Sequence, residues 1–325
     1  MPDKTYDVLI AGQGVAAFSA ALYAARYRID TVVVGEKFGG ETATGGLIEN
    51  YPGIYEIEGL DLMIKMKEQT EKYGVPIVDA KVIRIEREGE CFRCSTEEQS
   101  YRAASVILAV GRERRKLGLD HEDEWTGRGV SYCSVCDAPL NRNKVTAVVG
   151  GGDAAIKGAV LLSQYAKKVY VIYRGPRFTR PEPANLRHLE ERGNVEMLFN
   201  TNVVRLLGSD GLTGIELDRP VHGAKELALD SIFVEIGADP NASLAEQLGV
   251  SLTSEHEIDV DKMMRTNIEG VFAAGDVTNA SGHLKQAITA AAQGALAATS
   301  AYAYISTHGN ACERHAMGFA LEKAA

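Results

Sequence analysis

The chain twice joins a short apolar strand to a glycine-rich turn, and this pattern constrains its fold more than any other feature. The first copy has a strand at 6–10, the turn Gly12-x-Gly14-x-x-Ala17, an alanine-rich helix and a second strand at 31–34. In such a βαβ unit the glycines allow a tight turn, and the N–H groups at the helix start bind the pyrophosphate of a dinucleotide. The sequence therefore predicts parallel sheets of the α/β class.

The second copy begins near the middle of the chain, with a strand at 145–149 and a further strand at 168–173. One short glycine pattern is weak evidence, because such patterns recur by chance, but two complete units are more specific. We therefore expect a second dinucleotide site. The residues of its turn that we expect to contact the nucleotide are Gly150, Gly152, Asp153 and Ala155.

The residue after the second strand distinguishes the two sites. Glu36 follows Gly14 by 22 residues, close to the distance of about 20 at which an acid binds an unphosphorylated ribose. At the same distance after Gly152 the chain has Arg174. An arginine there accommodates a 2′-phosphate that a carboxylate would repel, so we expect the two sites to hold different nucleotides.

Length and composition set the number of domains and exclude some partners. With 325 residues the chain exceeds what one hydrophobic core usually supports, so we expect two domains. A net charge of −9 argues against a nucleic-acid partner. The alanine-rich stretch 287–304 contains Gln293 and is too weakly apolar to span a membrane. The first residues lead directly into strand 6–10 with no signal peptide, so we expect a cytoplasmic protein.

Between the two glycine turns lies the motif Cys133-Ser134-Val135-Cys136-Asp137. Two thiols separated by two residues can close into a disulfide at a helix start, where N–H groups lower the thiolate pKa. Asp137 is placed in sequence to transfer a proton, and capping the helix is an equally consistent role. Together with the two nucleotide turns, the motif suggests electron transfer from a nucleotide to sulfur.

The other cysteines carry weaker signals. Cys91 and Cys94 form a second Cys-x-x-Cys, but residues three apart in a strand point to opposite faces, which disfavours a direct bond. The wide spacing from Cys94 to Cys133 disfavours a zinc site, and we predict no metal. With five cysteines, an odd number, we predict no structural disulfide framework. We interpret Cys312 as part of an exposed terminus, 304–325, with a relay thiol or a flap over a cofactor as alternatives.

Two further segments bear on domain organisation. The charged run 112–116 follows the apolar run 105–110, and we predict that it is a solvated interdomain linker. A strand-and-glycine pattern recurs at 270–277, ahead of a helix that starts near Lys285. Because the first domain is short of elements, we expect this segment to return to it.

Further motifs accompany the glycine turns and the cysteine pair: Gly39-Gly40, Glu49-Asn50-Tyr51-Pro52-Gly53, Gly275-Asp276 and Gln286-Ala287-Ile288-Thr289-Ala290. With them the chain, from about residue 6 to 303, resembles the low-molecular-weight thioredoxin reductases. The resemblance implies a homodimer of chains with two Rossmann-like, three-layer ββα dinucleotide-binding domains, one inserted into the other. The FAD-binding domain would comprise 1–113 and 243–303, the NAD(P)-binding domain with the redox disulfide 114–242, and the tail 304–325.

The resemblance also implies roles for matching residues. Gly12, Gly14 and Glu36 would hold the FAD diphosphate and adenosine ribose, and Asp276 would hydrogen-bond the ribitol. The other residues expected around FAD are Ala17, Gly39, Gly40, Glu41, Asn50, Gly111, Gly275, Lys285, Gln286 and Ala287, of which the last two would lie along the isoalloxazine.

For the disulfide, the resemblance implies that Cys136 faces the flavin, Cys133 exchanges with the substrate disulfide, and Asp137 protonates a leaving thiolate. The expected partner is thioredoxin or a thioredoxin- or glutaredoxin-like protein. A flavin belongs between a nicotinamide, which gives hydride, and a disulfide, which accepts electrons through sulfur.

The chain departs from the family at several positions. Glu41 stands where the family usually has Gln, Ala138 where it has Gly, and Lys285 where it has Arg. These departures lie in or near the expected flavin and disulfide sites.

The nucleotide site departs further. The usual His-Arg-Arg reads Tyr173-Arg174-Gly175, so one arginine is missing, although Arg177 and Arg180 could supply the charge. We therefore expect NADPH as the electron donor, with NADH second and a different donor third.

Three other functions stay open. A dithiol oxidase would run the thiol chemistry in reverse with oxygen as acceptor, and the intact turn at Gly150 and Gly152 speaks against it. A reductase that takes electrons from ferredoxin or a deazaflavin is kept open by the incomplete arginine set. A non-catalytic flavoprotein would leave the pair of Cys133 and Cys136 without a use.

Overall fold

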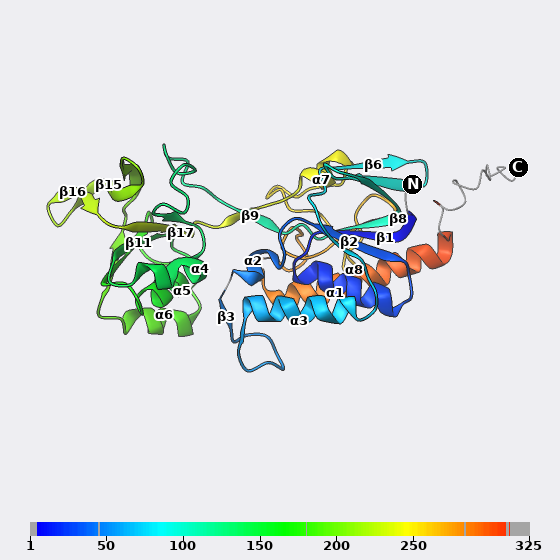
Figure 1. The fold of residues 1–325 in the computed structure, drawn as a ribbon, viewed down its shortest axis with the longest axis horizontal. Helices are drawn as coiled ribbons and strands as arrows, with labels where there is room; N and C mark the ends of the chain where they lie inside the picture. Colours follow the sequence, from blue (N-terminus) through cyan, green and yellow to red (C-terminus); the bar gives the residue numbers. More distant parts are fainter. Residues whose placement is uncertain (1–4, 45, 180, 283, 310–311, 313–325) are drawn as a thin grey trace, which may run out of the picture. The chain divides into compact units, whose positions relative to one another are not determined.

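Figure 1 shows the fold in a computed structural model, which describes residues 5–44, 46–179, 181–282, 284–309 and 312. The chain forms two compact units. Unit 1 contains the residues up to 112 together with those from 240 onward, and unit 2 contains residues 113–239. Unit 1 is therefore built from two separate stretches of sequence, with unit 2 between them in the chain.

A seven-stranded sheet forms the centre of unit 1, in the order β5-β2-β1-β8-β7-β6, with β19 also paired to β8. Strands β5, β2, β1, β8 and β19 run parallel, whereas β6, β7 and β8 form an antiparallel meander. The parallel pairing of β19 with β8 confirms that this segment returns to the first sheet. The strands are β1 (Thr5–Ala11), β2 (Thr31–Gly35), β5 (Ile77–Asp79), β6 (Arg84–Glu88), β7 (Cys91–Ser95), β8 (Ser100–Leu108) and β19 (Val271–Ala273).

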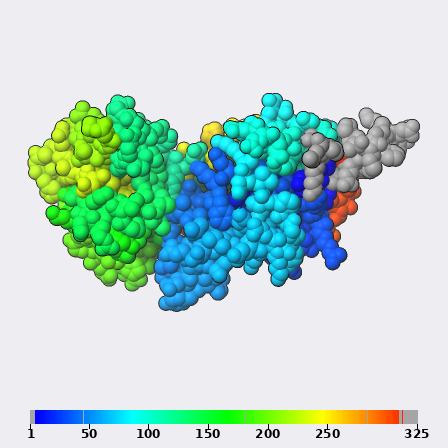
Figure 2. All heavy atoms as spheres, viewed as in Figure 1, coloured from blue at the N-terminus to red at the C-terminus, as the bar shows by residue number. Residues whose placement is uncertain are grey.

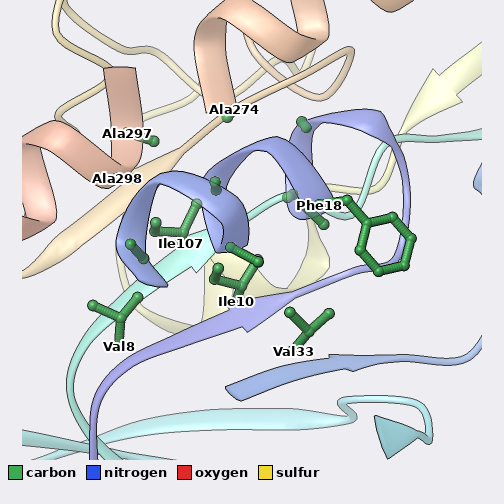
Figure 3. Close-up of a cluster of buried hydrophobic side chains, with 14 of the residues drawn as sticks. Val8, Ile10, Phe18, Val33, Ile107, Ala274, Ala297 and Ala298 are labelled. Atoms are coloured by element: carbon green, nitrogen blue, oxygen red, sulfur yellow. The ribbon is translucent and has the colours of Figure 1, made fainter. Parts of the chain in front are cut away.

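Three helices pack beside this sheet: α1 (Val15–Arg26), α3 (Gly59–Glu71) and α8 (Ala287–His308). Figure 3 shows α1 between the strands that carry Val8, Ile10 and Val33 and the helix α8, with Ala297 and Ala298 facing α1. The short side chains allow a close approach of the two helices, because a Cβ on Gly294 of α8 would overlap the backbone of α1. The apolar core of unit 1 therefore holds α8 against the glycine turn of α1.

Unit 2 repeats this plan. A five-stranded parallel sheet has the order β10-β17-β11-β12-β13, and a three-stranded antiparallel sheet has the order β14-β15-β16. Its strands are β10 (Val130–Ser131), β11 (Val145–Val149), β12 (Lys168–Tyr173), β13 (Val195–Phe199), β14 (Val203–Gly208), β15 (Leu212–Val221), β16 (Ala224–Ala228) and β17 (Ser231–Val234). Its helices are α4 (Ser134–Asp137), α5 (Asp153–Leu162) and α6 (Pro183–Glu190), with a 3₁₀ turn at Ala138–Asn141. The predicted α/β class with two Rossmann-like units is confirmed.

The two connecting segments form strands β9 (Arg112–Arg114) and β18 (Ala238–Pro240), which pair with each other. The prediction that the charged run 112–116 is simply solvated was wrong for two of its arginines. The side chains of Arg112 and Arg114 are only 20% and 21% exposed, and they form ion pairs with Glu257 and Glu235. Their partners lie far away in sequence, so local charge density could not reveal them.

The remaining elements of unit 1 are α2 (Gly40–Ala43), β3 (Leu47–Ile48), β4 (Ile57–Glu58) and α7 (Ser243–Gln247). The segment between α2 and α3, which contains the β3–β4 pairing, lies at the surface of unit 1 (Figure 2). Among the residues that the structure describes, no helix combines the length and apolarity that crossing a bilayer needs.

The C-terminal end of the described chain differs from the sequence prediction. Helix α8 continues to His308, and Cys312 is 2% exposed, not part of an exposed terminus. Its Cα lies 5.4 Å from that of Cys91. The apolar cluster that encloses both residues brings together parts of the chain 221 residues apart.

Candidate active site

The first glycine turn joins β1 to α1. Gly12 has a φ of +123°, and a Cβ there would overlap the carbonyl oxygen of Ala109, so only glycine fits. Gly14 is the N-cap of α1, no side chain caps this helix end, and the space in front of its Cα is open. Ala17 is fully buried in the core beneath. The N–H groups at this helix start can therefore receive a pyrophosphate.

Gln13 occupies the position between Gly12 and Gly14 that the glycine motif leaves unspecified, and it makes contacts that the motif does not require. Its side chain is 2% exposed, and its own carbonyl oxygen accepts a hydrogen bond from the N–H of Gly39 (2.9 Å). Its Nε2 donates to the carbonyl oxygens of Gly35 (2.8 Å) and Val78 (3.1 Å) and to a carboxylate oxygen of Asp79 (2.8 Å). Sequence reasoning missed this residue, which joins the turn to the ends of β2 and β5.

Several predicted flavin residues lie close to this turn. Gly39 and Gly40 adopt φ values of +74° and +53°. Gly40 lies next to Gly14, since a Cβ added to Gly40 would be in van der Waals contact with the Cα of Gly14 at 3.8 Å. Glu36 is exposed just beyond β2, where it lies 3.9 Å from the ammonium of Lys81. Two elements that are separate in sequence therefore form one surface around the helix start.

A charged cluster surrounds the residues that follow β19. Burial raises the pKa of Asp276, while the charges of Lys285 and Arg112 lower it and those of Glu41 and Glu257 raise it. A largely buried carboxylate favours a ligand whose hydroxyl group can donate a hydrogen bond to it. The predicted residues Asp276, Lys285 and Glu41 are thus brought within electrostatic range of one another.

Glu257 lies at the centre of this cluster, and the sequence analysis missed it. It is 6% exposed, and its carboxylate lies 2.8 Å from Nζ of Lys285 and 3.5 Å from a guanidinium nitrogen of Arg112. Lys285 also donates to the carbonyl oxygen of Thr278. Nε of Arg112 is buried and has no hydrogen-bond partner within the described residues.

The start of α8 adds polar groups to the same region. Gln286 is the N-cap, Thr289 completes a capping box, and Nδ2 of Asn50 donates to Oε1 of Gln286 at 3.2 Å. Ala287 is the first helical residue. Two predicted residues from distant motifs, Asn50 and Gln286, therefore meet.

Two backbone turns complete the surface in unit 1. Gly275 adopts a φ of +87°, and its N–H donates to Oε1 of the buried Gln293 at 2.7 Å. Gly111 adopts a φ of +64°, and its carbonyl oxygen accepts from the N–H of Asn241 at 3.0 Å. Gln293 was also missed, although a glutamine inside an alanine-rich helix is a signal of a buried polar contact.

In unit 2, Cys133 and Cys136 form a disulfide at the start of α4, with Cα atoms 5.3 Å apart. Cys133 is the N-cap of this helix, and its sulfur accepts a hydrogen bond from the N–H of Cys136 at 3.1 Å. Cys136 is exposed, whereas Cys133 and Asp137 are partly exposed. The helix-capping alternative for Asp137 was wrong, because its side chain makes no capping hydrogen bond.

Ser134, between the two cysteines, fixes the motif within unit 2. It is 4% exposed, and its hydroxyl donates to Oε1 of Glu235 at 3.0 Å. Helix α5 comes so close that a Cβ on Gly158 would lie 2.6 Å from this hydroxyl. Glu235 in turn pairs with Arg114 of β9 at 3.5 Å. The short helix α4 is therefore anchored through a residue that the Cys-x-x-Cys pattern leaves unspecified.

The second glycine turn resembles the first. Gly150 has a φ of +152°, and its Cβ would overlap the carbonyl oxygen of Glu235, whereas the space in front of Gly152, the N-cap of α5, is open. Ala155 is fully buried. Asp153 accepts hydrogen bonds from the N–H of Glu182 (2.9 Å) and from the side chain of Asn185 (3.1 and 3.0 Å), so it fixes the start of α6.

The structure explains the unusual sequence after β12. The ring of Tyr173 lies between Gly151 and Gly175, and a Cβ on either glycine would come within 2.6 Å of it or closer. A side chain at position 175 would therefore require the ring of Tyr173 to shift, so Tyr173 and Gly175 are coupled departures. Arg174 and Arg177 are exposed and form no ion pair with the described residues, and Arg180 lies outside the described residues.

The residues of unit 1 fit a flavin dinucleotide. The open space before Gly14 can receive a diphosphate. The partly buried Asp276 can accept from a ribitol hydroxyl, and the buried Nε of Arg112 lacks an acceptor within the described residues. The donor and acceptor types thus match those a flavin dinucleotide presents.

Comparison with known proteins agrees with this geometry. Residues 6–294 match the family model of the pyridine nucleotide-disulphide oxidoreductases. A thioredoxin reductase of Treponema pallidum is 38% identical over 94% of this chain and 99% of its own length. The crystal structure of Lactococcus lactis thioredoxin reductase superposes with a TM-score of 0.87 at 33% identity, over 93% of this chain and 99% of that chain.

A further structural relative is the ferredoxin-flavin thioredoxin reductase of Clostridium acetobutylicum, with a TM-score of 0.50 at 32% identity, over 93% of this chain and 99% of that chain. The relatives thus match the chain across both units. The chain belongs to the pyridine nucleotide-disulphide oxidoreductase family and, within it, to the thioredoxin reductases, oxidoreductases whose chemistry implies a flavin and a pyridine nucleotide.

Proposed function

We propose that this chain is an FAD-dependent enzyme that transfers electrons from NADPH to the disulfide of thioredoxin or a thioredoxin-like protein. The observation that carries the proposal is the Cys133–Cys136 disulfide, bonded at the start of α4 with Cys136 exposed. FAD, when bound, would accept hydride from the nicotinamide and supply two electrons to this disulfide.

The geometry of the pair supports distinct roles for its two sulfurs. Two electrons and two protons convert the disulfide to two thiols. The N–H of Cys136 donates to Sγ of Cys133, which would stabilise a thiolate on Cys133 and favour it as the nucleophile. Attack of Cys133 on the substrate disulfide forms a mixed disulfide, and Cys136 then attacks Cys133 to release the reduced substrate. Asp137, whose side chain caps neither helical segment, would supply the proton to the departing thiolate.

In unit 1, we assign FAD to the surface around the start of α1. Gly12 and Gly14 would hold the diphosphate, Glu36 the adenosine ribose, and Asp276 the ribitol. The assignment is supported by the open space at Gly14 and by the exposure of Glu36 beyond β2. The remaining residues assigned to FAD are Ala17, Gly39, Gly40, Glu41, Asn50, Gly111, Gly275, Lys285, Gln286 and Ala287.

In unit 2, we assign NADPH to the turn formed by Gly150 and Gly152. The exposed guanidinium groups of Arg174 and Arg177 support recognition of a 2′-phosphate. A second candidate donor is reduced ferredoxin, because Tyr173 lies against this turn and position 175 holds glycine instead of a second arginine. The two candidates share the same flavin and the same disulfide.

Anaerobic mixing of the purified flavoprotein with NADPH, NADH or reduced ferredoxin identifies the donor. We expect NADPH to bleach the flavin absorbance fastest. Bleaching by ferredoxin alone would replace NADPH by the second candidate. Rapid oxygen consumption with dithiols, and no bleaching by any of the three donors, would instead favour a dithiol oxidase.

Serine variants of the pair test the electron path. We expect Cys133→Ser and Cys136→Ser each to abolish thioredoxin reduction while flavin bleaching by the donor persists. Cys94→Ser is the matched control, because Cys94 is a buried free thiol in unit 1 and should leave turnover unchanged. Turnover in either variant of the pair would disprove the assigned path.

We also propose that the enzyme acts as a homodimer in the cytoplasm. The first statement is carried over from the family resemblance, and the second is the expectation drawn from the sequence. Sedimentation equilibrium tests the first, since a mass near the 35.0 kDa of one chain would contradict it. Fractionation of cells that express the chain tests the second.

A further inference from the structure

The end of α8 is held against unit 1 by several non-covalent contacts. The ring of Tyr304 packs edge-on against Phe272 of β19, with centroids 6.4 Å apart. His308 lies 3.3 Å from the carboxylate of Glu269. Ile305 packs on the small cluster that contains Cys91. These contacts fix the position of the last turn of α8.

Cys312, four residues after His308 in the sequence, lies beside Cys91. The two side chains are 2% and 4% exposed, share a cluster with Ala104, and have Cα atoms 5.4 Å apart. Disulfides form between Cα atoms that lie 4.4–6.8 Å apart, with a mode near 5.5–6 Å.

Cys94 does not compete for this bond. It is 1% exposed and belongs to a different apolar cluster, with Tyr101 and Leu108, so it points away from Cys91. Burial also raises the pKa of the Cys94 thiol to about 12, which keeps it protonated and unreactive near neutral pH.

We propose that Cys91 and Cys312 form a second, structural disulfide that fastens the end of α8 to the meander of unit 1 and is chemically separate from the catalytic pair. To form it, the thiolate of Cys312 attacks a low-molecular-weight disulfide, releasing one thiol and leaving a mixed disulfide. The thiolate of Cys91 then attacks the Cys312 sulfur and releases the second thiol. The protein loses two protons and two electrons, and the external disulfide gains them.

Burial separates the two disulfides in reactivity. Exchange at Cys91 requires that the end of α8 leave its contacts, whereas the exposed Cys136 is open to attack in the folded protein. A mild reductant should therefore reduce the Cys133–Cys136 bond and spare the Cys91–Cys312 bond. This inference does not depend on the electron donor or on the protein substrate.

Peptide mapping tests it on the full-length flavoprotein. The native protein is treated with dilute dithiothreitol and iodoacetamide, then denatured, labelled with N-ethylmaleimide and digested with trypsin. Trypsin separates the cysteines, since Cys91 lies in peptide 88–93, Cys94 in 94–102, the catalytic pair in 129–142 and Cys312 in 286–314.

We expect peptides 88–93 and 286–314 to be linked, with both cysteines of 129–142 carrying the first label and Cys94 carrying the second. A link between 88–93 and 94–102 would overturn the proposal. Iodoacetamide or N-ethylmaleimide label on both Cys91 and Cys312 would also overturn it, because a labelled Cys91 was a free thiol and was not bonded to Cys312.

Thermal unfolding supplies a second measurement. We expect Cys312→Ser to lower the melting temperature of unit 1 by about 5–10 °C under non-reducing conditions. The double variant Cys91→Ser/Cys312→Ser should melt at the same temperature as Cys312→Ser, because both lack the same bond. A Cys312→Ser protein that melts with the wild type would contradict a stabilising cross-link.

Discussion

Glu257 offers the sharpest test of how the charged cluster near Asp276 is held together. The substitution Glu257→Gln keeps the shape of the side chain and removes its charge. The backbone of this residue is fixed separately, because its N–H donates to Oγ1 of Thr253 and its carbonyl oxygen accepts from the N–H of the same residue. The variant should therefore change the electrostatics of the site with little change in the loop.

The expected magnitude follows from the two ion pairs. The carboxylate lies 2.8 Å from Lys285 and 3.5 Å from Arg112, and all three side chains are at most 20% exposed. At an effective dielectric constant of about 20, the gross attraction is about 6 and about 5 kcal/mol. Desolvation offsets most of this attraction, and removing one partner from a buried pair typically costs about 3–5 kcal/mol. Lys285 keeps its bond to Thr278, so we expect a loss near 3 kcal/mol.

The two units can be followed separately in one experiment. Trp125 is the only tryptophan of the chain and lies buried in unit 2, so its fluorescence reports the unfolding of that unit. Flavin release and the remaining circular dichroism change report unit 1. For a unit of this size, a loss of 3 kcal/mol lowers the melting temperature by about 10 °C. We expect Glu257→Gln to shift the unit 1 transition and leave the tryptophan transition in place.

The control is an ion pair of unit 1 that is open to solvent. Glu86 lies 2.7 Å from Arg84, with side chains 47% and 64% exposed, and Glu86→Gln should change stability by less than about 1 kcal/mol. A Glu257→Gln protein no less stable than this control would refute the argument that Glu257 neutralises two buried cations.

Four further outcomes follow from the structure. Gly12→Ala should destabilise the flavin-free protein by about 3 kcal/mol in urea unfolding. Gly14 has open space in front of its Cα, so Gly14→Ala should change the stability by less than about 1 kcal/mol. The same variant should weaken FAD binding in a fluorescence titration. Arg174→Ala should raise the KM for NADPH by about 10-fold or more and leave the KM for NADH unchanged, and an equal rise for both would contradict phosphate recognition. Burial raises the pKa of Asp276 in the folded protein above its value in the unfolded chain, so the stability that this residue contributes is full below the unfolded pKa and is lost as pH rises through the folded pKa. In the flavin-free protein, Asp276→Asn should abolish this loss of stability. Identical pH–stability curves for the variant and the wild type would contradict the argument. Cys94 should resist maleimide at pH 8 in the folded protein and react only on unfolding, which mass spectrometry detects.

Local patterns predicted the parallel sheets well. The strands expected at 145–149 and 168–173 coincide with β11 and β12, because apolar runs bounded by a glycine turn leave little freedom in register. The meander is harder to predict from local patterns. Its strand β6 lies at Arg84–Glu88, where four of the five residues are charged and the apolar signal is weak.

The predicted flavin residues lie close to one another, yet the side chains that position them were missed. The spacing of glycines identifies Gly12 and Gly14, because backbone geometry requires that residue type. Gln13, Gln293 and Glu257 act through contacts with residues that a sequence pattern does not relate to them. Such contacts follow from packing, so they become visible only once the elements are assembled.

The cysteines show where sequence reasoning stops. Alternation along a strand places Cys91 and Cys94 on opposite faces, and the structure confirms this, since Cys94 is free. The same alternation means that no residue of its own strand can pack against Cys91. The residue that does so is Cys312, 221 positions later in the sequence. It lies close to the end of α8, which Tyr304 and His308 hold against β19 and the loop before β19. A strand pattern can thus exclude a local partner for a cysteine, but only the packing of α8 identifies the distant one.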